Sequence, residues 1–226
     1  LCTKKGKKVW VEPRINKRQK TVSFKLHEGK GSPPKPPKMG RGAQFRCLVC
    51  GEVAPEEYIK DTGVADHSKA QLIGIVTEGP NRINYDAPSS EHETVAKRAE
   101  PDWTPDLEMS THPQYMAPPR YGMTEFSDLF TARQLVALTT LSDLVSEVYD
   151  VVFEQAIAAG MPDDQIALRE GGRGARAYAE AISFYLSVNI GRQANRLSAL
   201  CFWHYGRENI EPFFSRQAFT MNWNFA

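Results

Sequence analysis

The sequence predicts an α+β protein in which a small, basic, β-rich module precedes an α-helical domain. Three observations predict it. Apolar and polar residues alternate with the period of a strand near the N-terminus, a C-x-x-C-G motif follows at 47–51, and beyond residue 130 apolar residues recur at helical spacing. With 226 residues, 41% of them hydrophobic, the chain can bury a core.

Charge is distributed unevenly along the chain. Fourteen of the 28 lysines and arginines lie in residues 1–50, where Glu12 and Glu28 are the acidic residues, so this part has a net charge of +12. The remainder has a net charge of −11, and the whole chain +1. Such asymmetry is typical of a polyanion-binding module joined to an acidic domain, or of a basic arm that is solvated or docks on acidic protein.

Two strands are expected first, over KKVWVEPRI (7–15) and TVSFKL (21–26), joined by the polar turn NKRQK. The Gly-, Pro- and Lys-rich stretch 27–42 predicts an extended loop. A short helix (55–61), strands over 70–78 and 82–88, and an exposed helix over 90–100 follow. Five prolines in 101–121 indicate a linker.

The second half is expected to be helical. Thr131 and Gln134 have the spacing of a capping box, and apolar residues recur behind them at intervals of three and four residues up to Gly160. GGRG at 171–174 predicts a break, and a second long helix is expected from Ala175 to about His204, followed by a short helix over 208–217. The expected domains are therefore a basic β-hairpin with part of a zinc ribbon (1–60), a mixed segment with a Pro-rich linker (61–121) and an α-helical domain (122–226).

Cys47 and Cys50 predict half of a structural zinc site. Two thiolates at this spacing hold a metal from both sides of a tight turn, and Gly51 lets the backbone close it. A tetrahedral site needs two more ligands. Cys201 and His204 form a C-x-x-H pair, but lie far downstream within an expected helix, so a second pair preceding Leu1 is favoured. The alternative is a pair of reduced cysteines packed in a turn.

Two basic regions are candidates for binding phosphate. The first is the N-terminal arm, where contacts with DNA phosphates are predicted for Lys4, Lys5, Lys7, Lys8, Lys17, Arg18 and Lys20. Trp10 could stack on an unpaired base but more simply anchors the hairpin. The second is the GGRG turn, where Arg173 and Arg176 could bind a phosphate at a helix N-terminus, although a flexible loop explains it better.

Motifs for catalysis are missing from these residues. The sequence contains no nucleophile elbow, no H-E-x-x-H motif and no Gly-rich nucleotide loop after a strand. The first residues do not resemble a signal peptide, no apolar run has the length that a membrane span needs, and a cytoplasmic location is expected.

A family resemblance is carried by RYGMTEFSDLFTARQLVALTTLSDLV (120–145) and NRLSALCFWHYGRENIEPFFSRQAFTMNWNFA (195–226), with KKGKKVWVEP and C-x-x-C-G in the first part. These stretches resemble adenine-specific DNA methylases of bacteria and archaea that contain a zinc ribbon, over nearly the whole chain. In that family an S-adenosylmethionine-binding motif precedes this region and an Asp-Pro-Pro-Tyr motif follows it. Neither is present in these 226 residues.

The resemblance implies that the chain is an internal, DNA-recognising segment of such a methyltransferase, inactive alone. It also implies a zinc ion half held by Cys47 and Cys50, with the first cysteine pair shortly before Leu1, S-adenosylmethionine in the parent protein, and DNA and the flanking methyltransferase domain as partners. The alternatives are a non-catalytic nucleic-acid-binding or scaffold module, or an unrecognised free-standing enzyme.

Overall fold

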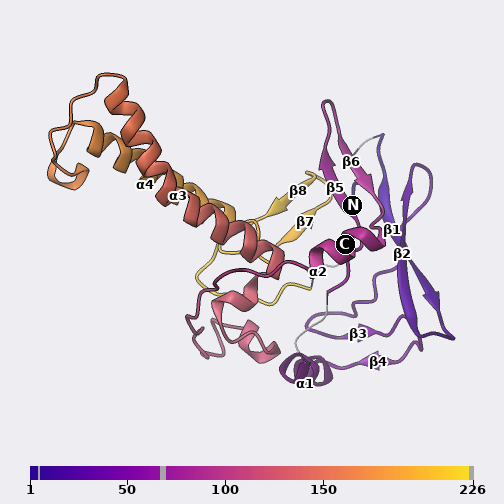
Figure 1. Cartoon of the computed structure of the whole chain (residues 1–226). Helices are drawn as coiled ribbons and strands as arrows, with labels where there is room; N and C mark the ends of the chain where they lie inside the picture. The colour runs from indigo at the N-terminus through magenta and orange to yellow at the C-terminus, as the bar shows by residue number, and fades with distance from the viewer. Residues whose placement is uncertain (5, 67–69, 224–226) are drawn as a thin grey trace. The chain divides into compact units, whose positions relative to one another are not determined.

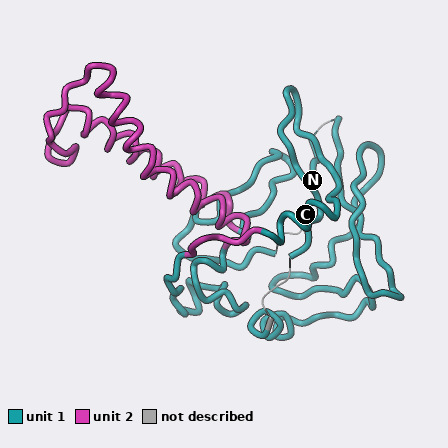
Figure 2. Tube along the Cα trace, in the orientation of Figure 1, with its two compact units in different colours: residues 1–98, 105–129, 199–226 teal, residues 99–104, 130–198 magenta. Residues whose placement is uncertain are grey.

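The structure is a computed structural model that describes residues 1–4, 6–66 and 70–223. The chain forms two compact units, coloured separately in Figure 2. Unit 1 comprises Leu1–Arg98, Pro105–Leu129 and Ala199–Ala226, and unit 2 comprises Ala99–Thr104 and Phe130–Ser198. Residues 199–226, which were expected to belong to the α-helical domain, lie in unit 1.

Unit 1 contains the strands, which pair as antiparallel two-stranded sheets (Figure 1). The longest hairpin joins β1 (Val9–Asn16) to β2 (Thr21–Glu28), as the alternation predicted. The shorter hairpins are β3 (Phe45–Arg46) with β4 (Val53–Ala54), β5 (Ile75–Glu78) with β6 (Ile83–Asp86), and β7 (Phe202–His204) with β8 (Asn209–Glu211). Its helices are α1 (Glu56–Asp66), α2 (Ser90–Lys97) and the 3-10 turns η1 (Pro118–Tyr121) and η2 (Phe126–Leu129).

A buried carboxylate links three distant segments of unit 1. Glu208 lies between β7 and β8 with a left-handed backbone, φ 57°, and its side chain is 6% exposed. Its Oε1 accepts hydrogen bonds from Tyr85 Oη of β6 at 2.7 Å and Lys7 Nζ at 3.1 Å, and Oε2 pairs with Lys4 Nζ at 2.6 Å. The hydrogen bond from Lys4, followed by those from Tyr85 and Lys7, lowers the pKa of Glu208 to about 2 against burial.

The same region holds the first residues of the chain in place. Cys2 is buried and exchanges backbone hydrogen bonds with Val9, while Trp203 Nε1 donates to the Leu1 carbonyl at 2.6 Å. The Tyr85 and Trp203 rings meet edge to face with centroids 6.4 Å apart. Burial, and then the Glu208 carboxylate, raise the pKa of the Tyr85 hydroxyl, so it remains a donor at neutral pH.

A second cluster in unit 1 holds α1 against η1. Gly122, with φ 85°, approaches so closely that a Cβ there would overlap the Gly63 carbonyl oxygen of α1. The Tyr121 ring meets the Trp223 ring edge to face at 5.2 Å, and Trp223 meets Phe45 of β3 at 5.3 Å. The aromatic chain therefore ties the start of the β3–β4 hairpin to residues far away in sequence.

Unit 2 is an α-helical hairpin. The predicted capping box begins α3 (Ala132–Ala158), where Gln134 Oε1 accepts the Thr131 N–H at 2.8 Å. Gly160 follows its end with φ 86°, as expected. The turn η3 (Leu168–Glu170) precedes α4 (Ala175–Ala194), which packs on α3. The start of α4 is enclosed, since Ala175, Ala177 and Ala179 are buried.

The structure confirms the α+β class but corrects the C-terminal helices. The predicted helix from Ala175 to His204 ends at Ala194, and Phe202–His204 is strand β7. The predicted helix over 208–217 contains strand β8 instead. Pro212 disfavours helical backbone at Glu211, and tertiary contacts of Trp203 and Glu208 outweigh local helix propensity.

Replacing Glu208 by Gln is expected to lower the free energy of unfolding of unit 1 by about 2 to 3 kcal/mol at pH 7, because Lys4 and Lys7 lose a buried partner. Since the pKa of Glu208 is lowered from 4.5 to about 2, its contribution is complete above pH 4.5 and declines as pH falls towards 2. Urea unfolding between pH 7 and pH 2.5, followed by tryptophan fluorescence, measures both effects. Glu211→Gln, which removes an exposed pair with Arg207, is the control, and an equal loss from both variants would contradict the assignment.

Gly122→Ala is expected to destabilise unit 1 by about 2 to 3 kcal/mol, through left-handed strain plus overlap with α1. Gly160→Ala is the control, because Gly160 has nearly the same φ, 86°, and a methyl carbon added to it would meet nothing within 4 Å. It should cost about 1 kcal/mol. Thermal unfolding of both variants tests the close approach, which equal losses would exclude.

Candidate cysteine knuckle and nucleic-acid interface

The β3–β4 hairpin presents Cys47 and Cys50 in a tight turn. Arg46 and Val53 are paired across the hairpin, and the turn closes with Cys47 N–H donating to Glu52 O at 2.7 Å and Gly51 N–H donating to Cys47 O at 2.9 Å. Gly51 has φ 83°, a left-handed conformation that glycine adopts without strain, and the backbone closes the turn there as the sequence predicted. Both cysteines are exposed, which argues against the alternative of thiols packed in a turn.

Several hydrogen-bond donors converge on the thiol of Cys47, the first cysteine of this turn. The backbone N–H of Cys50, then that of Val49 and the Cys50 side chain, lower the pKa of the Cys47 thiol. Amide donors that converge on sulfur stabilise a thiolate, the form that binds metal. This turn, residues 47–51, is named the knuckle. Its residue types, its exposure and the lowered pKa of Cys47 fit one half of a zinc site.

The described residues do not supply the rest of a site. Among residues 1–4, 6–66 and 70–223 no group of three or more His, Cys, Asp or Glu side chains could hold a metal ion. Cys201 and His204 therefore do not complete the knuckle; His204 Nδ1 instead accepts the Arg207 N–H at 3.0 Å within the β7–β8 turn. A zinc ribbon remains a prediction, for which Cys47 and Cys50 are two candidate ligands.

The basic residues predicted to contact DNA fall into separate groups. Lys4 and Lys7 are bound to Glu208, and Lys7 also lies over the Tyr85 ring at 4.7 Å and donates to Ile83 O at 2.7 Å. Lys8 is exposed and donates to Gly31 O at 3.2 Å. Lys5 lies outside the described residues. These lysines lie at the start of the basic arm, and two of them, Lys4 and Lys7, form contacts that stabilise the fold.

The tip of the β1–β2 hairpin presents the remaining three cations, Lys17, Arg18 and Lys20, and these three residues are named the hairpin tip. Asn16 Oδ1 accepts the Gln19 N–H at 3.1 Å, and Lys20 has φ 53°, so the turn is closed by its own polar groups. All three cations are exposed, and none forms an ion pair within the described part of the chain. The hairpin tip is therefore available to an external anion.

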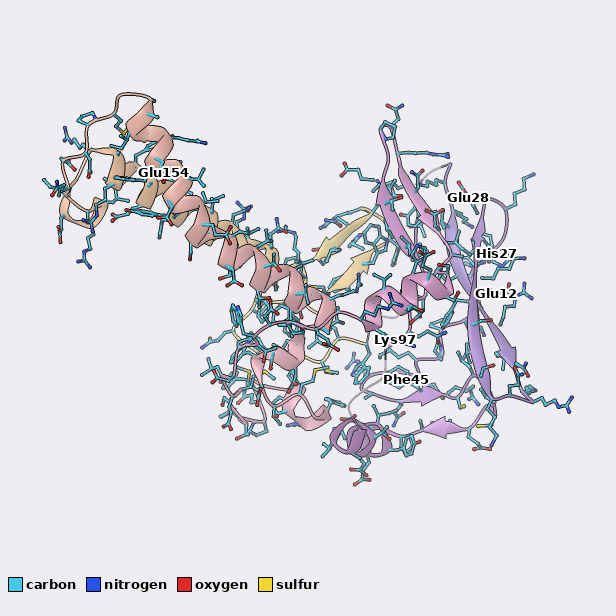
Figure 3. All side chains as sticks on the ribbon, in the orientation of Figure 1. Glu12, His27, Glu28, Phe45, Lys97 and Glu154 are labelled. Atoms are coloured by element: carbon cyan, nitrogen blue, oxygen red, sulfur yellow. The ribbon has the colours of Figure 1, made fainter. Side chains whose placement is uncertain are left out.

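Along the hairpin the aromatic and charged residues are paired. Trp10 stacks on His27 with centroids 5.4 Å apart, and the Trp10 ring lies against Gly31. Glu12 and His27, neighbours on β1 and β2 in Figure 3, are 2.7 Å apart, and Glu12 also binds Arg14 at 2.8 Å. Trp10 thus anchors the hairpin, the simpler of its two predicted roles.

The GGRG turn already holds an anionic group. Asp164 Oδ2 accepts the N–H groups of Arg173 at 2.8 Å and Gly174 at 3.2 Å, and the donation from Arg173 is the main cause of the lowered pKa of Asp164. Arg176 is engaged with Glu180 at 3.3 Å. An internal carboxylate therefore occupies the position at the start of α4 where a phosphate was considered.

Two carboxylates that stabilise these local structures, Asp164 and Glu208, were not predicted from the sequence. The pair of aspartates at 163–164, just before a Gly-rich helix start, is a signal for Asp164, since Asp caps backbone N–H groups. Glu208 has no comparable signal, because Lys7 lies 201 residues away in sequence.

Comparison with family models, with curated proteins and with solved structures found no match to this chain. No helix among the described residues meets the length and apolarity required to span a membrane. The geometry of the knuckle and of the hairpin tip is therefore the basis for proposing what these two sites bind.

Cys47 is expected to react with iodoacetamide at lower pH than an ordinary cysteine, because the donated hydrogen bonds lower its pKa. Cys50→Ala removes the side-chain donor and should move the pH profile of Cys47 alkylation upward, while leaving the backbone donors of residue 50 and Val49 in place. Mass spectrometry of the tryptic peptide gives the rate at each pH. Identical profiles in both proteins would exclude the hydrogen bond from the Cys50 side chain, and an ordinary profile for Cys47 in the unaltered protein would exclude the hydrogen-bonded thiolate.

Proposed function

We propose that this chain is a DNA-binding segment of an S-adenosylmethionine-dependent, adenine-specific DNA methyltransferase, with the cofactor-binding and catalytic groups supplied by other sequence. The hairpin tip is the observation that carries the DNA role. Lys17, Arg18 and Lys20 project from one closed turn with no counter-charge among the described residues, so phosphate binding costs no ion pair. The methylase assignment itself comes from the sequence resemblance.

In this proposal the contacts of the chain are with the DNA backbone. The tip cations bind phosphates and orient the duplex without reading its sequence. A methylase acts on an adenine that has left the helical stack, so a firm grip on the flanking backbone would support that extraction. Lys4 and Lys7 are assigned to the fold, and Arg173 and Arg176 are no longer assigned to phosphate.

The knuckle is proposed to hold a zinc ion through Cys47 and Cys50, with two further ligands from outside these 226 residues. Zinc would then act as a structural crosslink within a ribbon. Two thiolates alone hold zinc weakly, so occupancy in this chain should be low. The same proposal places the protein in the cytoplasm.

A scaffold module is the second candidate, and a specific observation favours it. Part of the basic arm docks on an acidic group of its own chain, where Lys4 and Lys7 bind Glu208. The exposed hairpin tip distinguishes the two functions, because a scaffold does not require it to bind nucleic acid.

Lys17→Gln/Arg18→Gln/Lys20→Gln is expected to weaken binding to a fluorescent DNA duplex at low salt and to reduce the slope of log K against log salt by up to about 2.7, roughly 0.9 for each phosphate that is no longer bound. The control, Arg133→Gln/Arg169→Gln/Arg192→Gln, removes three exposed arginines from unit 2 and should leave the slope unchanged. Fluorescence anisotropy at several salt concentrations measures both.

Negligible binding by the unaltered chain, or equal weakening by both triple variants, would remove the DNA role from the hairpin tip. Binding that survives with an unchanged slope would place the phosphate contacts elsewhere on the chain.

A further inference from the structure

Unit 2 leaves much apolar surface in contact with water. Twelve of the chain's large hydrophobic residues that are notably exposed belong to it. On α4, Phe184, Tyr185 and Val188 are 63%, 71% and 50% exposed. A two-helix hairpin can bury one seam between its helices, so the outer sides stay uncovered unless another element packs there.

On α3 four apolar residues, Leu141, Leu144, Val148 and Val151, form a ridge. Leu141, Leu144 and Val151 are 42%, 42% and 51% exposed, and Val148 is half-buried. Their spacing of three, four and three residues places them along one line of the helix. This spacing is the one that packs against a second helix.

An acidic stripe runs beside this ridge, formed by Asp143, Glu147, Asp150 and Glu154 at spacings of four, three and four. Glu147 is three residues after Leu144 and four before Val151, and Glu154 is three after Val151, so stripe and ridge are direct neighbours on α3. Glu154 is labelled on this helix in Figure 3.

The stripe has no counter-charge of its own. Residues 134–168 contain six acidic residues and no Lys, Arg or His. Within the described ranges no cation pairs with Glu147, Asp150 or Glu154, and Asp143 accepts a long hydrogen bond of 3.4 Å from Trp103 Nε1. The anionic side of the hairpin is therefore available to an external cation.

The carboxylates of the stripe favour some classes of molecule as ligands of the ridge and disfavour others. DNA and an anionic lipid surface would both be repelled by four carboxylates beside the contact. A second copy meeting ridge to ridge would bring eight carboxylates together, which is unfavourable for a symmetric interface. A helix with apolar residues at heptad spacing and Lys or Arg at the flanking positions meets both the ridge and the stripe.

We propose that α3 is a docking surface for a basic amphipathic helix of a partner protein, with the partner's apolar side chains on Leu141, Leu144 and Val151 and its cations on Glu147, Asp150 and Glu154. The apolar contact supplies the affinity, and the charges select the partner and its register. This interaction is independent of the proposed DNA role, since it uses unit 2 and opposite charges.

The test uses the whole chain and a fluorescent synthetic peptide of about 18 residues, with leucines at heptad spacing flanked by lysines. A peptide with the lysines changed to glutamates, and one with the leucine positions scrambled, are the probe controls. The lysine peptide should bind at least about tenfold more tightly than either, and rising salt should weaken it.

Two variants assign that binding to α3. Leu144→Gln/Val151→Gln should weaken it about tenfold or more, and Glu147→Gln/Glu154→Gln about three- to tenfold. Asp163→Asn/Glu170→Gln removes two carboxylates of unit 2 from outside the stripe and should have little effect. Circular dichroism checks that the helices remain folded, as expected for substitutions at exposed positions.

Four outcomes would overturn the proposal. The first two are equal binding of the lysine and glutamate peptides, and lysine-peptide binding that neither α3 variant weakens. The third is self-association, measured by sedimentation, that Leu144→Gln/Val151→Gln abolishes, which would identify a second copy as the occupant. The fourth is binding to anionic vesicles that depends on the ridge, which would identify a lipid surface instead.

Discussion

The buried carboxylate of Glu208 organises unit 1. A carboxylate with a side chain 6% exposed is stable only when it is fully partnered. Its partners are the N-terminal arm through Lys4 and Lys7, and β6 through Tyr85. Because Lys4, Lys7 and Tyr85 lie far from Glu208 in sequence, the contacts of this carboxylate join separate hairpins of the unit.

The partners of Glu208 also divide the basic arm into two functions. The first lysines neutralise Glu208, so they are unavailable to an external polyanion without loss of stability. The hairpin tip has no such commitment, and its turn is closed by Asn16 and Gln19 rather than by the cations. Net charge alone could not make this distinction, because it counts a neutralised lysine and an exposed one equally.

The two units carry surfaces of opposite charge. Unit 1 offers cations at the end of a hairpin, and α3 of unit 2 offers carboxylates beside an apolar ridge. Each suits a different class of macromolecule, a polyanion and a basic helix, and each would be repelled by the other's partner. In the two proposals the surfaces therefore have different partners.

Local signals in the amino-acid sequence were sufficient for several elements. Alternation predicted the β1–β2 hairpin, the Thr131 and Gln134 cap predicted the start of α3, and Gly51 predicted that the backbone closes a tight turn behind the cysteines. Each depends on residues a few positions apart, for which local geometry is sufficient.

The C-terminal part and the role of each charge depended on long-range contacts instead. Residues 202–211 have helical patterning, yet form β7 and β8 because Trp203 and Glu208 find their partners in the first residues of the chain and in β6. Contacts between residues so distant in sequence leave no local pattern, since their free energy arises only when the chain has folded.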